Sequence, residues 1–177
     1  MENRLLNITT RKISAMEKIV NKIHLYFYLI DTKVHLISNS FNPFRLLYKI
    51  PYIKKRDKKL GITRDEVLNN TFTDKQFGIS IMVSGGVLIA FVFLLLFSII
   101  NYSIKLFSLD FILNKEIFIS ISILSFLICY FLVFRNDKYL KYFKEFKRWN
   151  ETKKRRNVIK SVIVSLLLII IFFISLV

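Results

Sequence analysis

The chain has 177 residues, 54% of them apolar and 23% charged, and a formal net charge of +16 at pH 7. The stretch 87–100 has no polar side chain beyond Ser98, and a helix that is apolar all round is either buried or surrounded by lipid. The composition therefore excludes an ordinary soluble domain, and the single cysteine, Cys129, excludes an intramolecular disulfide.

The first 40 residues carry apolar side chains at alternating steps of three and four residues, which predicts an amphipathic helix with an unbroken heptad seam. Leu25, Leu29 and Leu36 widen the apolar face, which favours bundle packing over a two-stranded coiled coil. Two interpretations follow: the helix packs on its own chain through the seam, or the seam makes a coiled-coil-like contact between protomers. The seam consists of Ile13, Met16, Val20, Ile23, Phe27, Ile30, Val34 and Ile37.

The rest of the N-terminal region also contains helix signals. Pro43 suits the first position of a helix, which we expect to end near Pro51. Thr73 and Gln76 are spaced as a capping box, and we expect this box to start the first membrane span. Residues 1–76 are therefore predicted to form a basic region of several helices.

Three apolar runs are long enough to cross a bilayer. Each has 18–24 residues, and a helix needs about 20 residues to cross a hydrocarbon core of ~30 Å. No Pro or Gly follows Gly86, so every residue from Val87 onward can be helical. The predicted fold class is all-α: a multi-span helical membrane protein with a membrane region at 77–177 and a helical cytoplasmic N-terminal region. Its spans are expected at about 77–100, 117–134 and 158–177.

The excess positive charge lies in two blocks, which indicates an orientation. Residues 1–76 hold 15 Lys and Arg against 7 Asp and Glu, and residues 135–157 hold 10 against 3, whereas residues 101–116 are neutral. Basic flanks stay on the cytoplasmic side of a membrane. We therefore expect a cytoplasmic N-terminus, an external loop at 101–116, a basic amphipathic cytoplasmic helix at 135–157, and a C-terminus on the far side.

Residues 138–149 predict a helix with sharply divided faces. Three uses fit such a helix. It can lie on an anionic leaflet with its rings in the interface, pack its rings against the N-terminal helices, or bind RNA or DNA through phosphate contacts and base stacking. Its aromatic face consists of Tyr139, Tyr142, Phe143, Phe146 and Trp149, and its opposite face of Lys141, Lys144, Lys147 and Arg148.

A row of polar side chains enters the third span at steps of four residues, which keeps its members on one face of a helix starting near Asn150. Polar groups inside a membrane usually face a protein interior or a water-filled cavity. Three spans are too few to enclose a conduit, so the row predicts a homo-oligomeric ring, with Lys153 as a positive collar and Asn157 as a polar constriction. Alternatively, Lys153 and Lys160 only extend to the lipid headgroups. The candidate pore-lining row consists of Trp149, Lys153, Asn157, Ser161 and Ser165.

Catalytic and metal-binding patterns are absent from the sequence. His24 and His35 are the only histidines, no acidic pair lies within a span, and the common nucleophile, zinc and phosphate-binding motifs do not occur. We expect no enzymatic activity, no cofactor and no metal site. The expected partners are the lipid bilayer and further copies of the chain.

A short basic chain with a helical cytoplasmic half, three spans and a cationic helix between the last two resembles the small membrane accessory proteins of type VI-B CRISPR systems. The resemblance covers the length and layout of the whole chain. It implies a functional link to an RNA-guided RNase and a ring-shaped pore in the bacterial inner membrane. Such a pore would lower the membrane potential after viral RNA is cut, with Trp149, Lys153 and Asn157 in the functional row.

The chain departs from that family in one respect. The family has been described as carrying a degenerate nuclease motif in which an Arg stands a few residues before a His. Neither His24 nor His35 has an Arg at that distance, and the nearest Arg upstream is Arg11. The departure puts RNase activity in doubt.

Two other functions stay open on the sequence alone. One is a membrane-tethered module that binds RNA or a ribonucleoprotein through the two basic blocks without forming a conduit. Because phosphate-driven binding weakens steeply with salt, salt dependence separates this module from a pore. The other is a holin-like lysis factor.

Overall fold

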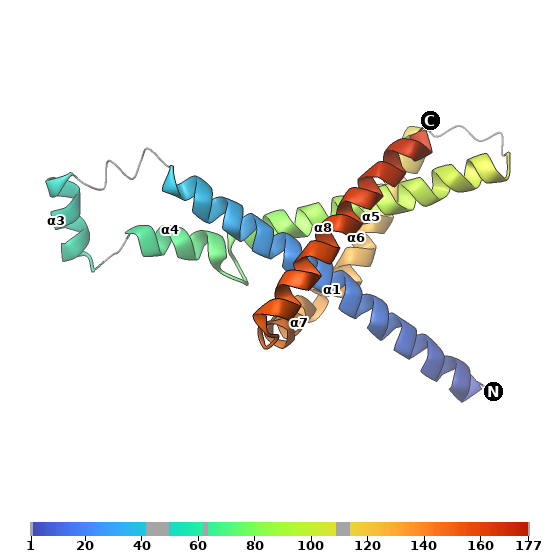
Figure 1. Ribbon diagram of the computed structural model, residues 1–177, viewed down its shortest axis with the longest axis horizontal. Coiled ribbons are helices and arrows are strands. Elements are labelled where there is room, and N and C mark those ends of the chain that lie inside the picture. Colours follow the sequence, from blue (N-terminus) through green and yellow to red (C-terminus); the bar gives the residue numbers. More distant parts are fainter. Residues whose placement is uncertain (1, 42–49, 62–63, 109–113, 177) are drawn as a thin grey trace. The chain divides into compact units, whose positions relative to one another are not determined.

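The computed structural model describes residues 2–41, 50–61, 64–108 and 114–176, and most of these residues are helical. Within these ranges, side chains are described from residue 15 on, apart from those of 40 and 64–66. The predicted all-α class is thereby confirmed. The α-helices are α1 (Glu2–Ser40), α3 (Pro51–Lys59), α4 (Arg64–Thr73), α5 (Ile79–Leu106), α6 (Lys115–Cys129), α7 (Lys138–Lys147) and α8 (Glu151–Leu176) (Figure 1). They belong to two compact units, Met1–Tyr26 with Gly86–Val177 and Phe27–Gly85.

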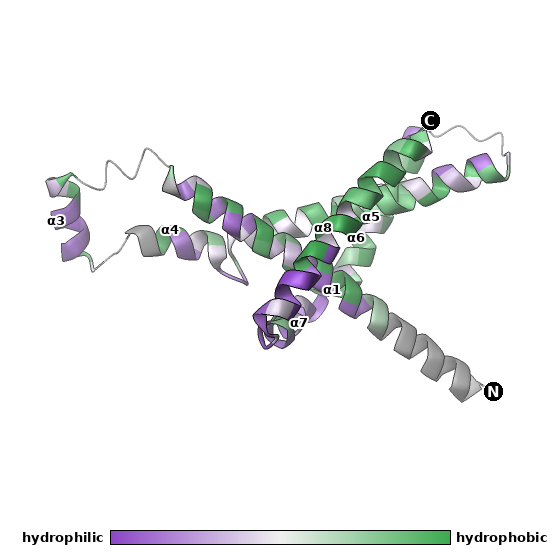
Figure 2. Ribbon diagram, viewed as in Figure 1, coloured by the Kyte–Doolittle hydropathy of each residue, from purple (hydrophilic) through white to green (hydrophobic). Residues whose placement is uncertain are grey.

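Three helical segments are long and apolar enough to cross a membrane: α5, the segment Lys115–Lys147 that contains α6, and α8. They coincide with the three predicted spans. α8 begins at Glu151, well before its apolar run. This start agrees with the helix near Asn150 on which the candidate pore-lining row is predicted. Figure 2 shows that α5, α6 and most of α8 are hydrophobic, whereas α3 is largely hydrophilic. Many apolar side chains of these segments are exposed, as expected of helices in lipid, among them Ile123, Phe126, Ile163, Leu166 and Ile170.

The three membrane-length helices contact one another around Phe97 of α5, which is 3% exposed. The centroid of its ring lies 5.1 Å from that of Phe118 on α6 and 5.6 Å from that of Phe172 on α8. One helical turn further along α5, the buried Asn101 donates from Nδ2 to the carbonyl oxygen of Ser175, at 2.6 Å. Aromatic contacts and one buried amide therefore hold α5, α6 and α8 together within the chain.

A sharp break separates α6 from α7 although neither Pro nor Gly is present there. The helix continues into a π-helical turn, η1 (Tyr130–Phe134), which is followed by a 3-10 turn, η2 (Arg135–Asp137). Asn136 and Asp137 have φ angles of 58° and 51°, and Asn and Asp enter this left-handed region more readily than most residues. The absence of Pro and Gly after Gly86 therefore permits a helix but does not keep this part of the chain helical, because an Asn-Asp pair can end a helix as Gly does.

Within the second unit, the expectation for Pro51 is wrong. Pro51 does not end a helix but starts α3, directly after the N-cap residue Ile50. Pro suits this position because the first N–H groups of a helix have no partner within it. Past the end of α3, Gly61 has a φ of 63°, which is typical of the residue that follows a helix. The helix predicted to start at Pro43 lies outside the described residues.

One hydrogen bond and one ring stack join the C-terminal half of α1 to α4 within the second unit. The buried Tyr28 donates its hydroxyl hydrogen to the carbonyl oxygen of Thr73. Two turns further along α1, the ring of His35 stacks on that of Phe72. Both partners lie at the end of α4, so α1 fixes the point at which the chain turns towards α5.

The turn before α5 is made by Asp74 and not by the predicted capping box. Thr73 is the last residue of α4, and its hydroxyl donates to the carbonyl oxygen of Asn69. The Asp74 carboxylate accepts from the backbone N–H groups of Gln76 and Phe77 at 2.7 and 2.6 Å. These two bonds, chiefly the one from Phe77, lower the pKa of Asp74 because they favour its charged form.

The substitution Gly78→Ala is expected to disrupt this turn. A Cβ atom at Gly78 would lie 2.8 Å from the amide nitrogen of Asp74 and from the carbonyl oxygen of Phe72, and nearer still to the Asp74 carbonyl oxygen. Backbone atoms cannot move aside as a side chain can, and overpacking costs about 1–3 kcal/mol. We expect the midpoint of thermal unfolding in detergent to fall by several degrees.

Gly86→Ala is the matched control for this experiment. A Cβ atom at Gly86 would meet no described atom within 4 Å, and Ala has a higher helix propensity than Gly. The unfolding midpoint of this variant is expected to stay unchanged or to rise. An equal fall in both variants would contradict the role assigned to Gly78.

Candidate functional site

The N-terminal helix α1 buries a polar row in preference to its apolar seam. Asn21 and His24 have no exposed surface, and each stands one residue after a seam member, which places it about 100° further around the helix. The seam is therefore not the main packing face of α1 within the chain, and its use between copies of the chain stays a prediction. Of the seam, Met16, Ile30, Val34 and Ile37 are exposed, Val20, Ile23 and Phe27 are half-buried, and the side chain of Ile13 lies outside the described residues.

Glu17 and Asn21 attach α1 to the break between α6 and α7. Asn21 donates from Nδ2 to the carbonyl oxygen of Leu132 at 2.9 Å, inside the π-helical turn η1, where the regular α-helical bonding pattern is interrupted. The Glu17 carboxylate accepts from the Lys138 ammonium at 2.7 Å and from the Tyr142 hydroxyl at 3.0 Å. Two polar side chains of α1 thus hold the segment before the break and the helix after it.

His24 is enclosed by aromatic rings from the same two segments. The ring centroids of Phe134, Tyr139 and Phe143 lie 5.5, 5.6 and 5.4 Å from that of His24, the first two in edge-to-face arrangement. Such pairs contribute about 0.5–1.5 kcal/mol each beyond the area they bury. The surroundings of His24 are those of a packing residue between α1 and α7.

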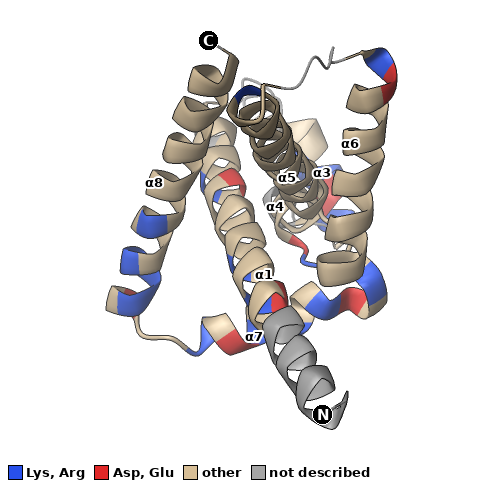
Figure 3. Ribbon diagram, turned by 90° about the vertical axis from the view of Figure 1, so that its right-hand side faces the viewer, with Lys and Arg blue, Asp and Glu red and all other residues tan. Residues whose placement is uncertain are grey.

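The rings of α7 point into the protein and its cations point outward. This arrangement is the second of the three uses expected for the amphipathic segment, in which the rings pack against the N-terminal helix. Figure 3 shows the Lys and Arg residues of α8 confined to the end of that helix that follows α7 in the chain. Tyr139, Tyr142, Phe143 and Phe146 are buried, whereas Lys141, Lys144, Lys147 and Arg148 are exposed.

Lys22 of α1 reaches the start of the predicted pore-lining row. Its ammonium donates to Oδ1 of Asn157 at 2.8 Å and lies 5.5 Å from the centroid of the Trp149 ring. The Lys153 ammonium lies 4.2 Å from the same ring, and both separations fall within the range of cation–π contacts. Three members of the row therefore share one contact region with α1. Asn157 and Ser161 are buried, Trp149 and Ser165 are half-buried, and Lys153 is exposed.

The contact region concentrates positive charge. Burial, followed by the nearby charges of Lys160, Lys153 and Arg156, lowers the pKa of Lys22 below its usual value. Among the residues whose side chains are described, no carboxylate forms an ion pair with any of these four cations. The folded unit thus brings like charges together without supplying a counter-charge from its described part.

No motif in the sequence marks Glu17, Asn21 or Lys22 as site residues. The signal that identifies the first two is the spacing of Glu17, Asn21, His24 and Tyr28, which repeats the steps of the seam one residue later. A polar row at helical spacing indicates a second face that packs on polar partners. The partners themselves lie more than a hundred residues away, at Leu132, Lys138 and Tyr142.

Searches of protein-family models, of curated proteins and of solved structures found no match to this chain. Within the part of the chain that is described, no group of three or more His, Cys, Asp or Glu side chains is placed to hold a metal ion. The candidate site is thus defined by its own geometry. It is the region where α1, α7 and α8 meet, with clustered cations, packed rings and the buried amide of Asn157.

The substitution Glu17→Gln is expected to loosen the attachment of α1. It keeps the shape of the side chain but removes the charge that receives both Lys138 and Tyr142. Bonds to charged groups contribute about 1.5–3 kcal/mol, and partial exposure of this pair reduces that figure to about 1–2 kcal/mol. We expect a fall of several degrees in the unfolding midpoint and faster proteolysis within α1.

Glu151→Gln provides the control, because Glu151 pairs with Lys154 at the same 2.7 Å but is 90% exposed. Exposed pairs of this kind contribute about 0.3–0.5 kcal/mol. A Glu17→Gln variant as stable as Glu151→Gln would show that the Glu17 contacts do not hold α1 in place.

Proposed function

We propose that this chain is a subunit of a homo-oligomeric membrane pore. The observation that carries the proposal is the polar row on α8, a helix that is otherwise apolar through its membrane-length part. Asn157 and Ser161 are buried although the helix around them exposes apolar side chains. Asn157 directly precedes the apolar run and Ser161 lies inside it, and polar groups inside a membrane span usually serve a protein interior or a water-filled path. Three spans cannot enclose a path alone, so the path requires several copies.

In the proposed ring, Lys153 forms a positive collar and Asn157 a polar constriction, with Ser161 and Ser165 deeper in the membrane. The bond from Lys22 to Asn157 supports a gating role for α1. While this bond exists, the amide of Asn157 is engaged by α1 and does not face a conduit. Opening would then require α1 to release Asn157, and a signal received by the N-terminal region could drive that release.

The layout of the chain supports a setting for this activity. A basic helical N-terminal region, three membrane-length helices and a cationic helix between the last two are the features shared with the accessory proteins of type VI-B CRISPR systems. We place the pore in the bacterial inner membrane, with the N-terminus in the cytoplasm and the C-terminus on the far side. There it would depolarise the membrane after an RNA-guided RNase has cut viral RNA.

Charge reversal at Lys153 tests the collar. In cells that carry the chain and an activated RNA-guided RNase, Lys153→Glu is expected to change depolarisation and to shift selectivity towards cations, because a ring of carboxylates replaces a ring of ammonium groups. A potential-sensitive dye measures the first effect and reversal potentials in planar bilayers the second. Lys141→Glu makes the same charge change on the exposed face of α7 and should leave both unchanged at equal expression. No potential change for the unmodified protein in any activated condition would refute the pore.

The exposed part of the seam is the surface best suited to join protomers. Val34 and Ile37 are 55% and 62% exposed on one face of α1, and a/d positions of a heptad seam pack against partner helices. The double substitution Val34→Glu with Ile37→Glu is expected to convert the oligomer to smaller species, as measured by light scattering in detergent. Lys33→Glu, beside the seam, is the control and should keep the oligomer. Unchanged mass in the double variant would remove the seam from the assembly.

A second candidate function is a membrane-tethered module that binds RNA, and the exposed cations of α7 favour it. The rings of α7 are buried, so base stacking is not available on this helix and only phosphate contacts remain. Affinity for RNA would then fall steeply with rising salt. A holin-like lysis factor has no observation of this kind in its favour.

A further inference from the structure

A cluster of four cations lies where α8 changes from a basic to an apolar helix. The cationic cluster consists of Lys22 from α1 and Lys153, Arg156 and Lys160 from α8. The three α8 members fall within two turns, and the apolar run of the helix starts at Val158, between them. The cluster therefore lies at one end of the membrane-length part of α8, at the depth where phospholipid headgroups meet the hydrocarbon core.

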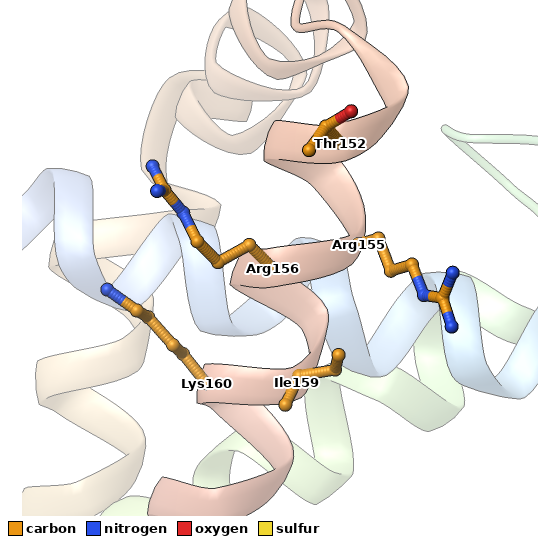
Figure 4. A pocket seen from close by; sticks show the side chains of 5 residues that line it. All are labelled: Thr152, Arg155, Arg156, Ile159 and Lys160. Atoms are coloured by element: carbon orange, nitrogen blue, oxygen red, sulfur yellow. The ribbon is translucent and has the colours of Figure 1, made fainter.

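A shallow hollow of about 390 Å³ adjoins the cationic cluster on the side of α8. Figure 4 shows Arg156 and Lys160, one turn apart, extending to one side of α8, with Arg155 and Ile159 towards its other side. Two cations one turn apart can contact the oxygens of a single phosphate together. The hollow is lined by Thr152, Arg155, Arg156, Ile159 and Lys160.

The hollow continues into an apolar strip along α8. Ile159, which lines it, is 50% exposed, and Ile163 and Leu166 follow at steps of four and three residues with 50% and 55% exposed. These steps place the three side chains on one face of the helix. A ligand that fills both parts must carry a negatively charged group at one end and hydrocarbon at the other.

We propose that the cationic cluster binds the phosphate of an anionic phospholipid, whose acyl chains lie along the strip from Ile159 to Leu166. The four cations have no ion-pair partner among the described side chains, and an anionic headgroup supplies the missing counter-charge. A zwitterionic headgroup is a poorer ligand, because its own cation would join the cluster. The headgroup would also weaken the repulsion that Lys160, Lys153 and Arg156 exert on Lys22.

This chemistry favours lipid over RNA and over a free phosphate ion. The ring nearest the cluster, that of Trp149, is half-buried and has the ammonium groups of Lys22 and Lys153 over it, which compete with a base that would stack there. A free phosphate ion would leave the apolar side of the hollow uncovered. The proposal requires that α8 crosses the bilayer, as in the proposed function, but it does not require a pore.

The full-length protein in a zwitterionic detergent allows a direct test. Trp149 is the only tryptophan of the chain. Its ring contacts Lys22 and Lys153 of the cationic cluster, so its fluorescence reports binding there. Dioctanoyl phosphatidylglycerol is expected to change the emission at a concentration at least about tenfold lower than dioctanoyl phosphatidylcholine does. Arg156→Gln and Lys160→Gln should each weaken phosphatidylglycerol binding about fivefold, because one cation near a membrane surface contributes about that factor.

Three variants control for nonspecific attraction and for misfolding. Lys141→Gln removes one exposed charge from α7 and should leave the affinity unchanged. Arg156→Lys and Lys160→Arg keep the charges and should lose less affinity than the Gln variants do, because the attraction of a charge to an anionic headgroup is preserved. Equal affinity for both lipids, an equal loss in Lys141→Gln, or a loss in the charge-preserving variants as large as in the Gln variants would overturn the proposal.

Two further titrations identify the source of the phosphate. Glycerol 3-phosphate that binds as tightly as phosphatidylglycerol would replace the lipid with a free phosphate ligand. Oligouridine that binds more tightly than the lipid, with the same dependence on Arg156 and Lys160, would replace it with RNA. Depolarisation is measured separately, so lipid binding that persists in a chain without pore activity refutes the proposed function alone.

Discussion

The arrangement of the first unit depends on the attachment of one polar face of α1 to the break between α6 and α7. At that break the chain leaves α-helical geometry at η1 and turns through Asn136 and Asp137. Asn21 binds a carbonyl group of the π-helical turn, and Glu17 binds the helix that follows. A helix break at the end of an apolar segment leaves polar backbone groups that need partners, and α1 supplies one.

The same attachment determines what the other faces of α1 can do. Successive residues of a helix point about 100° apart, so fixing Asn21 on the break also fixes its neighbour Lys22. That direction is towards α8, where Lys22 meets Asn157 and the Trp149 ring. The apolar seam, one residue behind the polar row, is then left largely uncovered within the protomer. One helix thereby presents a buried polar face, a cationic face and an exposed apolar face.

The sequence predicts the apolar parts of this structure well and its polar contacts poorly. The spans and the division of α7 into two faces follow from hydrophobic periodicity, which reports burial of side chains of a known kind. The role of Pro51 was open to error because Pro suits the start of a helix as well as the position after one. The contacts of Glu17, Asn21 and Lys22 could not be predicted, because an isolated polar side chain does not reveal a partner so distant in the sequence.

Pore opening and lipid binding, as proposed, both act on Lys22, and this shared residue couples them. If Asn157 lines a conduit, Lys22 must first leave it, which forfeits a hydrogen bond from a charged donor worth about 1.5–3 kcal/mol. Repulsion from Lys160, Lys153 and Arg156 favours that departure. An anionic headgroup bound at Arg156 and Lys160 weakens the repulsion and so stabilises the engaged position of α1. Linkage is reciprocal, so a signal that releases α1 from Asn157 must also lower the affinity of the cluster for lipid.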